Sequence, residues 1–151
     1  MVMANLDAFR EDFALFFEAG LVAIKQGDEV SAQALFQVLH VLDPEHTAYE
    51  VGNGLIHLHK MELTQAESLF RVVVEKDPEN WSAKAFLSLT LMMIVLHQGS
   101  SFEVRRESLE QCLRLADQVL ENCKIESTKA LARSVLDWHD ELVAKSCGPL
   151  N

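Results

Sequence analysis

Histidines and acidic residues are the side chains of this sequence that could bind a metal ion or transfer protons. The tightest histidine pair is His57 and His59 in "HLH". On a helix these two side chains would point about 200° apart, so they cannot share one metal ion. His40 and His46 belong to another predicted helix and to a loop. Because the Cys/His spacing of zinc sites is also missing, we expect no metal, and we expect His57 to be a partly buried, hydrogen-bonded histidine.

The motif "DWHDE" at residues 137–141 combines carboxylates with a histidine, as an acid–base site would. On a helix Asp137 and Glu141 share one face, so we expect a solvated face beside a core tryptophan, Trp138. Cys112 lacks a base nearby in sequence, and we expect it among core leucines. The sequence has no glycine-rich phosphate loop, no GxSxG and no HExxH. We therefore expect no catalytic residue, no cofactor and no enzyme activity.

The composition indicates one globular domain with an acidic surface. The chain has 151 residues, of which 49% are hydrophobic and 24% charged, and its formal net charge is −10. This charge argues against nucleic acid or an anionic membrane as a partner, because like charges repel. Two interpretations remain open: the domain binds a basic or apolar protein, or the charge only keeps an apolar protein in solution.

The N-terminal sequence and the cysteines bear on localisation. Acidic residues interrupt the first twenty residues, where a signal peptide needs an apolar region, and no run approaches the roughly 18 apolar residues of a membrane span. Three cysteines without CxxC spacing fit a reduced chain. We expect a cytoplasmic protein.

An internal repeat organises the chain. Asp-Pro-Glu occurs at residues 43–45 and again at residues 77–79, 34 positions later. The same shift places Gly20 on Gly54, Leu21 on Leu55, Ala32 on Ala66, Leu35 on Leu69, and Phe36 on Phe70. Glycine in a helix costs about 1 kcal/mol relative to alanine, which predicts a close approach of a neighbouring helix at these positions. A residue before proline is pushed out of the helical region, so each Asp-Pro is expected to end a helix.

This pattern of types and period resembles the tetratricopeptide repeat, a 34-residue helix–turn–helix unit. The resemblance covers residues 13–79 most strongly and implies an all-α array of about three helix pairs with a C-terminal capping helix. We expect one domain over residues 1–151, with repeats at 13–46, 47–80 and a divergent 81–124, and a cap at 127–145. The predicted helices are 8–25, 29–42, 47–60, 64–76, 81–97, 104–123 and 127–145.

The third repeat departs from the pattern. Ser88 stands in place of glycine, Ser100 in place of alanine, and no proline closes the unit. The second helix of this repeat fits the pattern after an insertion of nine residues. The capping helix carries an apolar stripe of Leu131, Val135, Leu136 and Leu142.

The resemblance also implies a concave groove lined by the first helix of each pair. The groove positions are Ala14, Phe17, Leu21, Ile24, Ala48, Val51, Leu55, Leu58, Ser82, Ala85, Leu89 and Met92, and only the serine is polar. Phe17 and Leu21 stand where the clamp for a chaperone's acidic C-terminus would need lysine and asparagine. We therefore expect an amphipathic helix or an extended apolar segment as the ligand. Cover by the last helix or by a second copy of the chain is the alternative.

The stretch "FFEAGLVAIKQGDEVSAQALFQVLHVLDPE" is similar to the first repeat of the tetratricopeptide chaperones of bacterial type III secretion. That resemblance implies a cytosolic chaperone that covers a segment of a secreted subunit, alone or together with a co-chaperone. About a dozen residues precede the first repeat, which favours the needle-subunit class over the translocator class. The alternatives are a general scaffold or adaptor and a regulatory repeat protein that responds to a peptide. A homodimer remains open.

Overall fold

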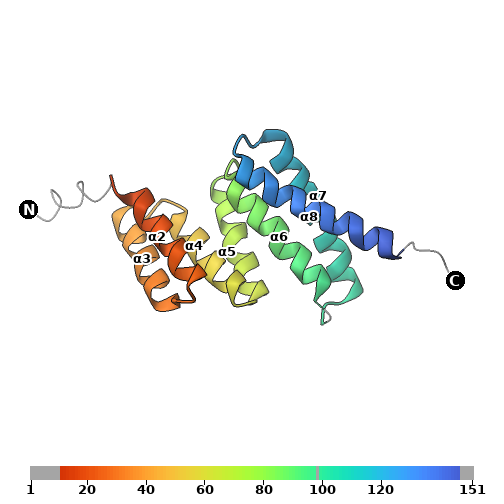
Figure 1. Cartoon of the computed structure of the whole chain (residues 1–151), viewed down its shortest axis with the longest axis horizontal. Coiled ribbons are helices and arrows are strands. Elements are labelled where there is room, and N and C mark those ends of the chain that lie inside the picture. The colour runs from red at the N-terminus through yellow and green to blue at the C-terminus, as the bar shows by residue number, and fades with distance from the viewer. Residues whose placement is uncertain (1–10, 98, 147–151) are drawn as a thin grey trace, which may run out of the picture. The chain divides into compact units, whose positions relative to one another are not determined.

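The computed structural model describes residues 11–97 and 99–146, and this part of the chain contains seven α-helices and no strand (Figure 1). The helices are α2 (Phe13–Lys25), α3 (Glu29–Leu42), α4 (Ala48–His59), α5 (Leu63–Lys76), α6 (Trp81–Leu96), α7 (Phe102–Asn122) and α8 (Glu126–Ser146). The predicted all-α class is confirmed.

The observed helix bounds lie close to the predicted ones, with one exception at the N-terminus. The predicted start of the first helix at residue 8 lies outside the described residues. Within them, α2 begins at Phe13, after a turn at Glu11 and Asp12. The later helices begin and end within two residues of the predicted positions.

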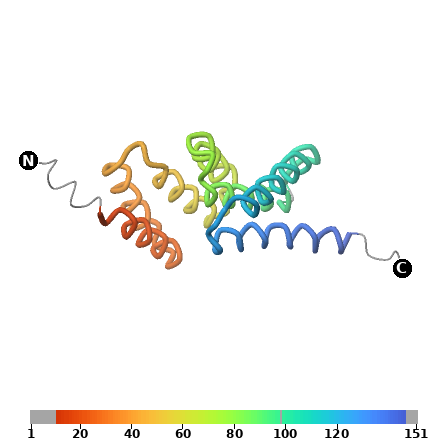
Figure 2. The backbone as a smooth tube through the Cα atoms, turned by 90° about the horizontal axis from the view of Figure 1, so that it is seen from above, coloured from red at the N-terminus to blue at the C-terminus, as the bar shows by residue number. Residues whose placement is uncertain are grey.

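The chain divides into two compact units, Met1–Asp77 and Pro78–Asn151, called unit 1 and unit 2 below. In unit 1, α2 packs on α3 and α4 packs on α5 as helical hairpins, and α4 also contacts α2 and α3 (Figure 2). In unit 2, α6 and α7 form a hairpin, and α8 packs against both. The boundary between the units falls at the second Asp-Pro. That residues 1–151 act as one domain stays a prediction.

The two Asp-Pro pairs end their helices in the same way. Asp43 follows α3 with φ −148° and Asp77 follows α5 with φ −137°, both extended as expected before proline. Each still donates its backbone N–H to the last turn, Asp43 to the Leu39 carbonyl at 3.0 Å and Asp77 to the Val73 carbonyl at 2.8 Å. The recurring motif is thus a helix terminator.

The turns inside the two pairs of unit 1 also match at a shift of 34 residues. Gly27 after α2 has φ +75°, and Met61 after α4 has φ +61°. The N–H of Gly27 bonds to the Ile24 carbonyl, and the following N–H, of Asp28, bonds back to the Ala23 carbonyl at 2.9 Å. Met61 and Glu62 make the corresponding bonds to Leu58 and His57. This is the Schellman pattern, whose left-handed position favours glycine. The second turn carries methionine there instead.

Two phenylalanines fill the space that the glycines leave. A Cβ atom on Gly20 would lie 2.4 Å from the Phe36 ring, and one on Gly54 would lie 2.6 Å from the Phe70 ring. Both phenylalanines are fully buried. Gly52 on α4 meets the other side of the first ring, because its Cβ would lie 2.5 Å from Phe36. The expected close approach at the helical glycines is confirmed.

In unit 2 a hydrogen bond takes the place of this ring contact. Ser88 on α6 is fully buried and donates its hydroxyl to the Cys112 carbonyl on α7 at 2.9 Å. Gly20 and Phe36 lie 16 positions apart in the chain, whereas Ser88 and Cys112 lie 24 apart. This contact fits an insertion of eight residues rather than the predicted nine.

Of the apolar stripe predicted for the last helix, α8, Val135 is buried and the three leucines are partly exposed. Val135 is fully buried, and Leu131 and Leu136 pack against a cluster that contains Ala85 and Ala132. Trp138, expected in the core, is 41% exposed. It lies outside the buried stripe of α8, so its ring keeps contact with solvent.

We predict that Gly20→Ala lowers the free energy of unfolding by about 1–3 kcal/mol, because the new methyl group would overlap the Phe36 ring in a filled core. The gain of roughly 1 kcal/mol in helix propensity offsets this only in part. Urea unfolding followed by circular dichroism measures the change. Gly99→Ala is the control, since its Cβ would come no closer than 3.6 Å to another side chain. A Gly20→Ala variant as stable as wild type would contradict the packing argument.

We predict that Met61→Gly raises the free energy of unfolding by about 1 kcal/mol. The left-handed conformation costs an L-residue roughly 1–2 kcal/mol, whereas glycine adopts it without this strain. The Met61 side chain is 59% exposed, so little packing is lost. Gly27→Ala, the reciprocal change at the matching turn, should lower stability by a similar amount. Equal stability of both variants and wild type would disprove the assignment of strain.

Candidate functional site

Five apolar side chains on α2 and α4 of unit 1, two helices that contact each other, are each partly exposed, and together they are here called the α2/α4 face. These residues are Phe17, Leu21, Ile24, Leu55 and Leu58. The three on α2 pack with one side against the buried cluster around Phe36, and the Phe17 and Phe36 ring centroids lie 5.7 Å apart. The inner side of each α2 residue is thereby fixed by the core, while part of its surface stays open to solvent.

The other predicted groove positions of unit 1 differ from this face. Ala14 is exposed. Ala48 and Val51, at the start of α4, are only 7% and 6% exposed. The packing of unit 1 already encloses these two side chains, and that they line a binding groove stays a prediction.

Unit 2 contains the remaining predicted positions, all on α6. Ala85 and Met92 are fully buried, so they also belong to the core rather than to an open groove. Leu89 and Ser82 are partly exposed, and the Ser82 hydroxyl lies 3.3 Å from that of Thr128 on α8. Helix α6 is apolar on all sides, as expected for a helix enclosed by neighbours.

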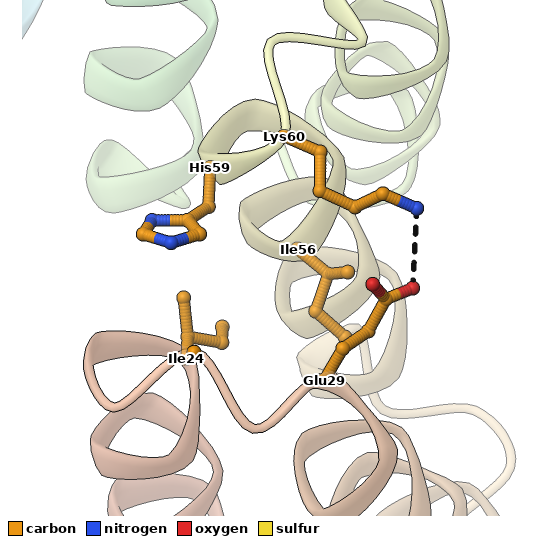
Figure 3. A pocket seen from close by; sticks show the side chains of 6 residues that line it. Ile24, Glu29, Ile56, His59 and Lys60 are labelled. Carbon is orange, nitrogen blue, oxygen red and sulfur yellow. Dashed lines mark hydrogen bonds and ion pairs between the residues drawn. The ribbon is translucent and has the colours of Figure 1, made fainter.

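A pocket of about 160 Å³ opens where the C-terminal ends of α2 and α4 meet the start of α3 (Figure 3). Its walls are Ile24, Gly27, Glu29, Ile56, His59 and Lys60. Figure 3 shows the His59 ring facing Ile24 across the opening, with Ile56 to their right, toward Glu29 and Lys60. An engineered apolar cavity of about 150 Å³ holds benzene, so a space of this size accepts one large apolar side chain.

A polar network borders this pocket and ties three helices together. Lys60 Nζ lies 3.2 Å from Glu29 Oε1 at the start of α3 and 3.2 Å from Glu62 Oε1 before α5. His57 Nδ1–H donates to the second oxygen of Glu62 at 2.5 Å. The hydrogen bond from His57, followed by that from Lys60, lowers the pKa of Glu62. Glu62 and then Glu29 raise the pKa of Lys60.

The side chains considered for catalysis or metal binding are spread over several helices, and within the DWHDE motif His139 Nδ1 lies 3.2 Å from Asp140 Oδ1. His57 is partly buried and hydrogen-bonded, as predicted. Asp137 and Glu141 are exposed on α8. Cys112 is a free thiol that is fully buried, and burial raises its pKa. Within residues 11–97 and 99–146, no three His, Cys, Asp or Glu side chains are grouped to hold a metal ion.

A search of the described helices for a membrane span finds none that combines the necessary length and apolar character.

The pocket residues other than Ile24 were not among the predicted groove positions. The predicted groove positions, which were placed by the 34-residue repeat, all lie on the first helix of each pair. Gly27, Glu29 and Lys60 belong instead to the turns or to the start of a second helix. The signal that could have indicated the pocket is the pair of matching turns after α2 and α4. Two neighbouring turns of the same shape bring their flanking side chains together.

No protein-family model, curated protein or solved structure gives a significant match to this chain. The contacts and exposure of its own residues therefore carry the functional proposal.

We predict that Glu62→Gln weakens the acid dependence of stability. A carboxylate with a lowered pKa contributes stability above its ordinary pKa of 4.5, and that contribution is lost as the pH falls through the lower folded-state value. The variant should therefore be less stable than wild type at pH 7, and the difference should disappear as the pH falls below the ordinary pKa of glutamate and through the lower folded-state value. Chemical unfolding at several pH values measures this difference. Glu75→Gln, an exposed change on α5, should keep the wild-type dependence. Parallel curves for wild type and Glu62→Gln would rule out the network as the cause.

Proposed function

We propose that this protein is a tetratricopeptide-repeat chaperone of the type III secretion class, which binds an apolar or amphipathic segment of a secreted subunit on the α2/α4 face. The repeated contacts of unit 1 support the repeat assignment. The phenylalanine–glycine contact, the left-handed turn and the Asp-Pro terminator each recur after 34 residues.

The single observation that carries the binding proposal is the partial exposure of the α2/α4 face. Leu21 and Leu55 occupy matching positions of the two pairs, on helices that contact each other. The core holds Leu21 from one side, so a ligand meets a surface that is already ordered and loses little additional side-chain entropy on binding. An amphipathic helix laid on such a surface buries apolar area on both partners.

The proposed mechanism is steric cover. A secreted subunit with an apolar segment would assemble or enter a membrane too early if that segment were free. Binding on the α2/α4 face would keep the segment out of water and away from other copies until export. The acidic surface would keep the complex in solution, since like-charged complexes repel one another.

A second candidate function, an adaptor that binds through the outer surface of a helix pair, is favoured by one feature of α3. Its exposed residues include no charge and contain three valines, Val30 at 79%, Val38 at 40% and Val41 at 60% exposure. An uncharged, partly apolar helix surface on an acidic unit suits a protein contact. The two candidates use different helices, so matched substitutions separate them.

We predict that Leu21→Glu combined with Leu55→Glu weakens partner binding at least 100-fold. Each leucine contributes about 1.5–3 kcal/mol when fully buried, and an unpaired carboxylate opposes burial further. The partner is first recovered by co-purification from the native host and identified by mass spectrometry, and its affinity is then measured by calorimetry. Glutamate matches leucine in helix propensity, so far-UV circular dichroism should be unchanged.

The matched control is Val30→Glu combined with Val41→Glu on α3, which should leave the affinity unchanged. If this control pair abolishes binding and the leucine pair does not, the partner binds on α3. That result would support the adaptor proposal and contradict binding on the α2/α4 face. The milder pair Leu21→Ala and Leu55→Ala covers the case in which glutamate unfolds unit 1. That variant should still lose about tenfold or more in affinity while remaining folded.

A further inference from the structure

The negative charge of the protein is concentrated in unit 1. Residues 11–77 carry twelve acidic and four basic side chains, a formal charge of −8, whereas residues 78–146 carry ten acidic and eight basic side chains, a formal charge of −2. The net charge of −10 for the whole chain is therefore almost entirely a property of the unit that contains the α2/α4 face. A charge that served only solubility would be expected to be spread evenly over the two units.

Ion pairing inside unit 1 leaves its net charge unchanged but engages most of its cations. Of the four basic residues between positions 11 and 77, three are engaged: Lys60 with Glu29 and Glu62, Arg71 with Glu67, and Lys76 with Glu50. The fourth, Lys25, is exposed at the C-terminal end of α2. The remaining carboxylates of unit 1 thus have few cations of their own chain to neutralise them.

The two ends of the α2/α4 face differ in charge. At the N-terminal end, the Phe13 ring at the start of α2 lies against the His46 ring before α4, with centroids 4.6 Å apart. The His46 N–H bonds to the carbonyl of Asp43, so the exposed Asp43 lies at the same end as Glu11. At the C-terminal end are the pocket, Lys25, and Lys60 with its partners Glu29 and Glu62, so cations and carboxylates occur together there.

Exposed carboxylates also border the face along α2. Glu18 lies one turn after Ala14 and one turn before Leu21, so it is the surface neighbour of both residues. Neither Glu11 nor Glu18 forms an ion pair within the described residues. An occupant of the apolar face would therefore bring its polar flank close to carboxylates that its own charges could neutralise.

We propose that the α2/α4 face binds an amphipathic helix whose apolar stripe is flanked by lysine or arginine, with these cations toward the N-terminal ends of α2 and α4. This inference rests on the proposed function and specifies the chemistry of the partner. A cationic flank gains attraction from Glu11, Glu18 and Asp43, and an anionic flank is repelled by them. The apolar side chains supply the affinity, and the charges select among apolar helices.

Three synthetic peptides of about 14 residues, long enough to span roughly the 20 Å of α2, test the proposal on the full-length protein. Two share one leucine stripe and differ only in their flanks, which are lysine in the first and glutamate in the second. The third has the composition of the lysine peptide in scrambled order, without a stripe. Calorimetry at low salt should show the lysine peptide binding about tenfold or more tightly than the glutamate peptide. Each exposed ion pair changes the affinity only a few-fold, so this difference is the combined effect of several pairs. The difference should shrink toward 1 M salt, where the screening length is about 3 Å.

Matched charge variants decide whether the position of the carboxylates matters or only the net charge. Glu11→Gln, Glu18→Gln and Asp43→Asn together neutralise three acids of unit 1. Glu107→Gln, Glu121→Gln and Asp137→Asn neutralise three exposed acids of unit 2 and change the net charge equally. The first triple variant should reduce the lysine-over-glutamate preference to less than about threefold. The second should retain the wild-type preference.

The outcomes separate this proposal from the one on which it rests. If both leucine-stripe peptides bind equally and lose affinity in the Leu21→Glu, Leu55→Glu variant, the face is a binding site and the charge proposal is wrong. If no stripe peptide binds, or the scrambled peptide binds as well as the ordered one, the proposed apolar site itself is wrong. If the unit 2 variant loses the preference as fully as the unit 1 variant, the selection comes from net charge rather than from this face.

Discussion

The contact of the Phe36 ring with the backbones of two glycines is the constraint on which the rest of unit 1 depends. The ring lies between Gly20 on α2 and Gly52 on α4, so one side chain sets the spacing of three helices. Any Cβ atom on either glycine would overlap the ring. Because this contact fixes how closely α2 and α4 approach, it also fixes the spacing of Leu21 and Leu55, which follow Gly20 and Gly54 directly in the chain.

In unit 2 the first two helices are joined by a hydrogen bond rather than by a contact between a ring and a glycine. A serine replaces the helical glycine at position 88, and its hydroxyl is satisfied by the Cys112 carbonyl rather than left unpaired in the core. Helix α6 is apolar on all sides and is enclosed by α7 and α8 within unit 2. The sequence of α6 and α7 therefore builds a different core, in which burial of α6 removes Ala85 and Met92 from the surface.

Local signals in the sequence predicted most of the fold but only part of the site. The Asp-Pro pairs, the glycine-containing turn and the 34-residue shift were sufficient to place the helix bounds after residue 25 within two residues. Exposure was harder, because the same apolar type serves as core or surface depending on neighbours that periodicity does not identify. Val51 is enclosed although Leu55, one turn later, is partly open, and Trp138 is exposed although its type favours the core. The pocket was missed because its walls come from two turns and three helices.

The distribution of charge opposes self-association through the partly exposed apolar face. An open hydrophobic surface promotes self-association unless electrostatic repulsion opposes the approach of a second copy. Placing a charge of −8 on the unit that carries the face makes like copies repel where the risk is greatest, whereas the same charge attracts a cationic segment. The negative charge of unit 1 would then both oppose self-association and select cationic partners. Under the proposed function, Glu18 and its neighbour Leu21 act together: the carboxylate would keep identical surfaces apart, and the leucine would contribute binding energy to a partner whose charges are complementary.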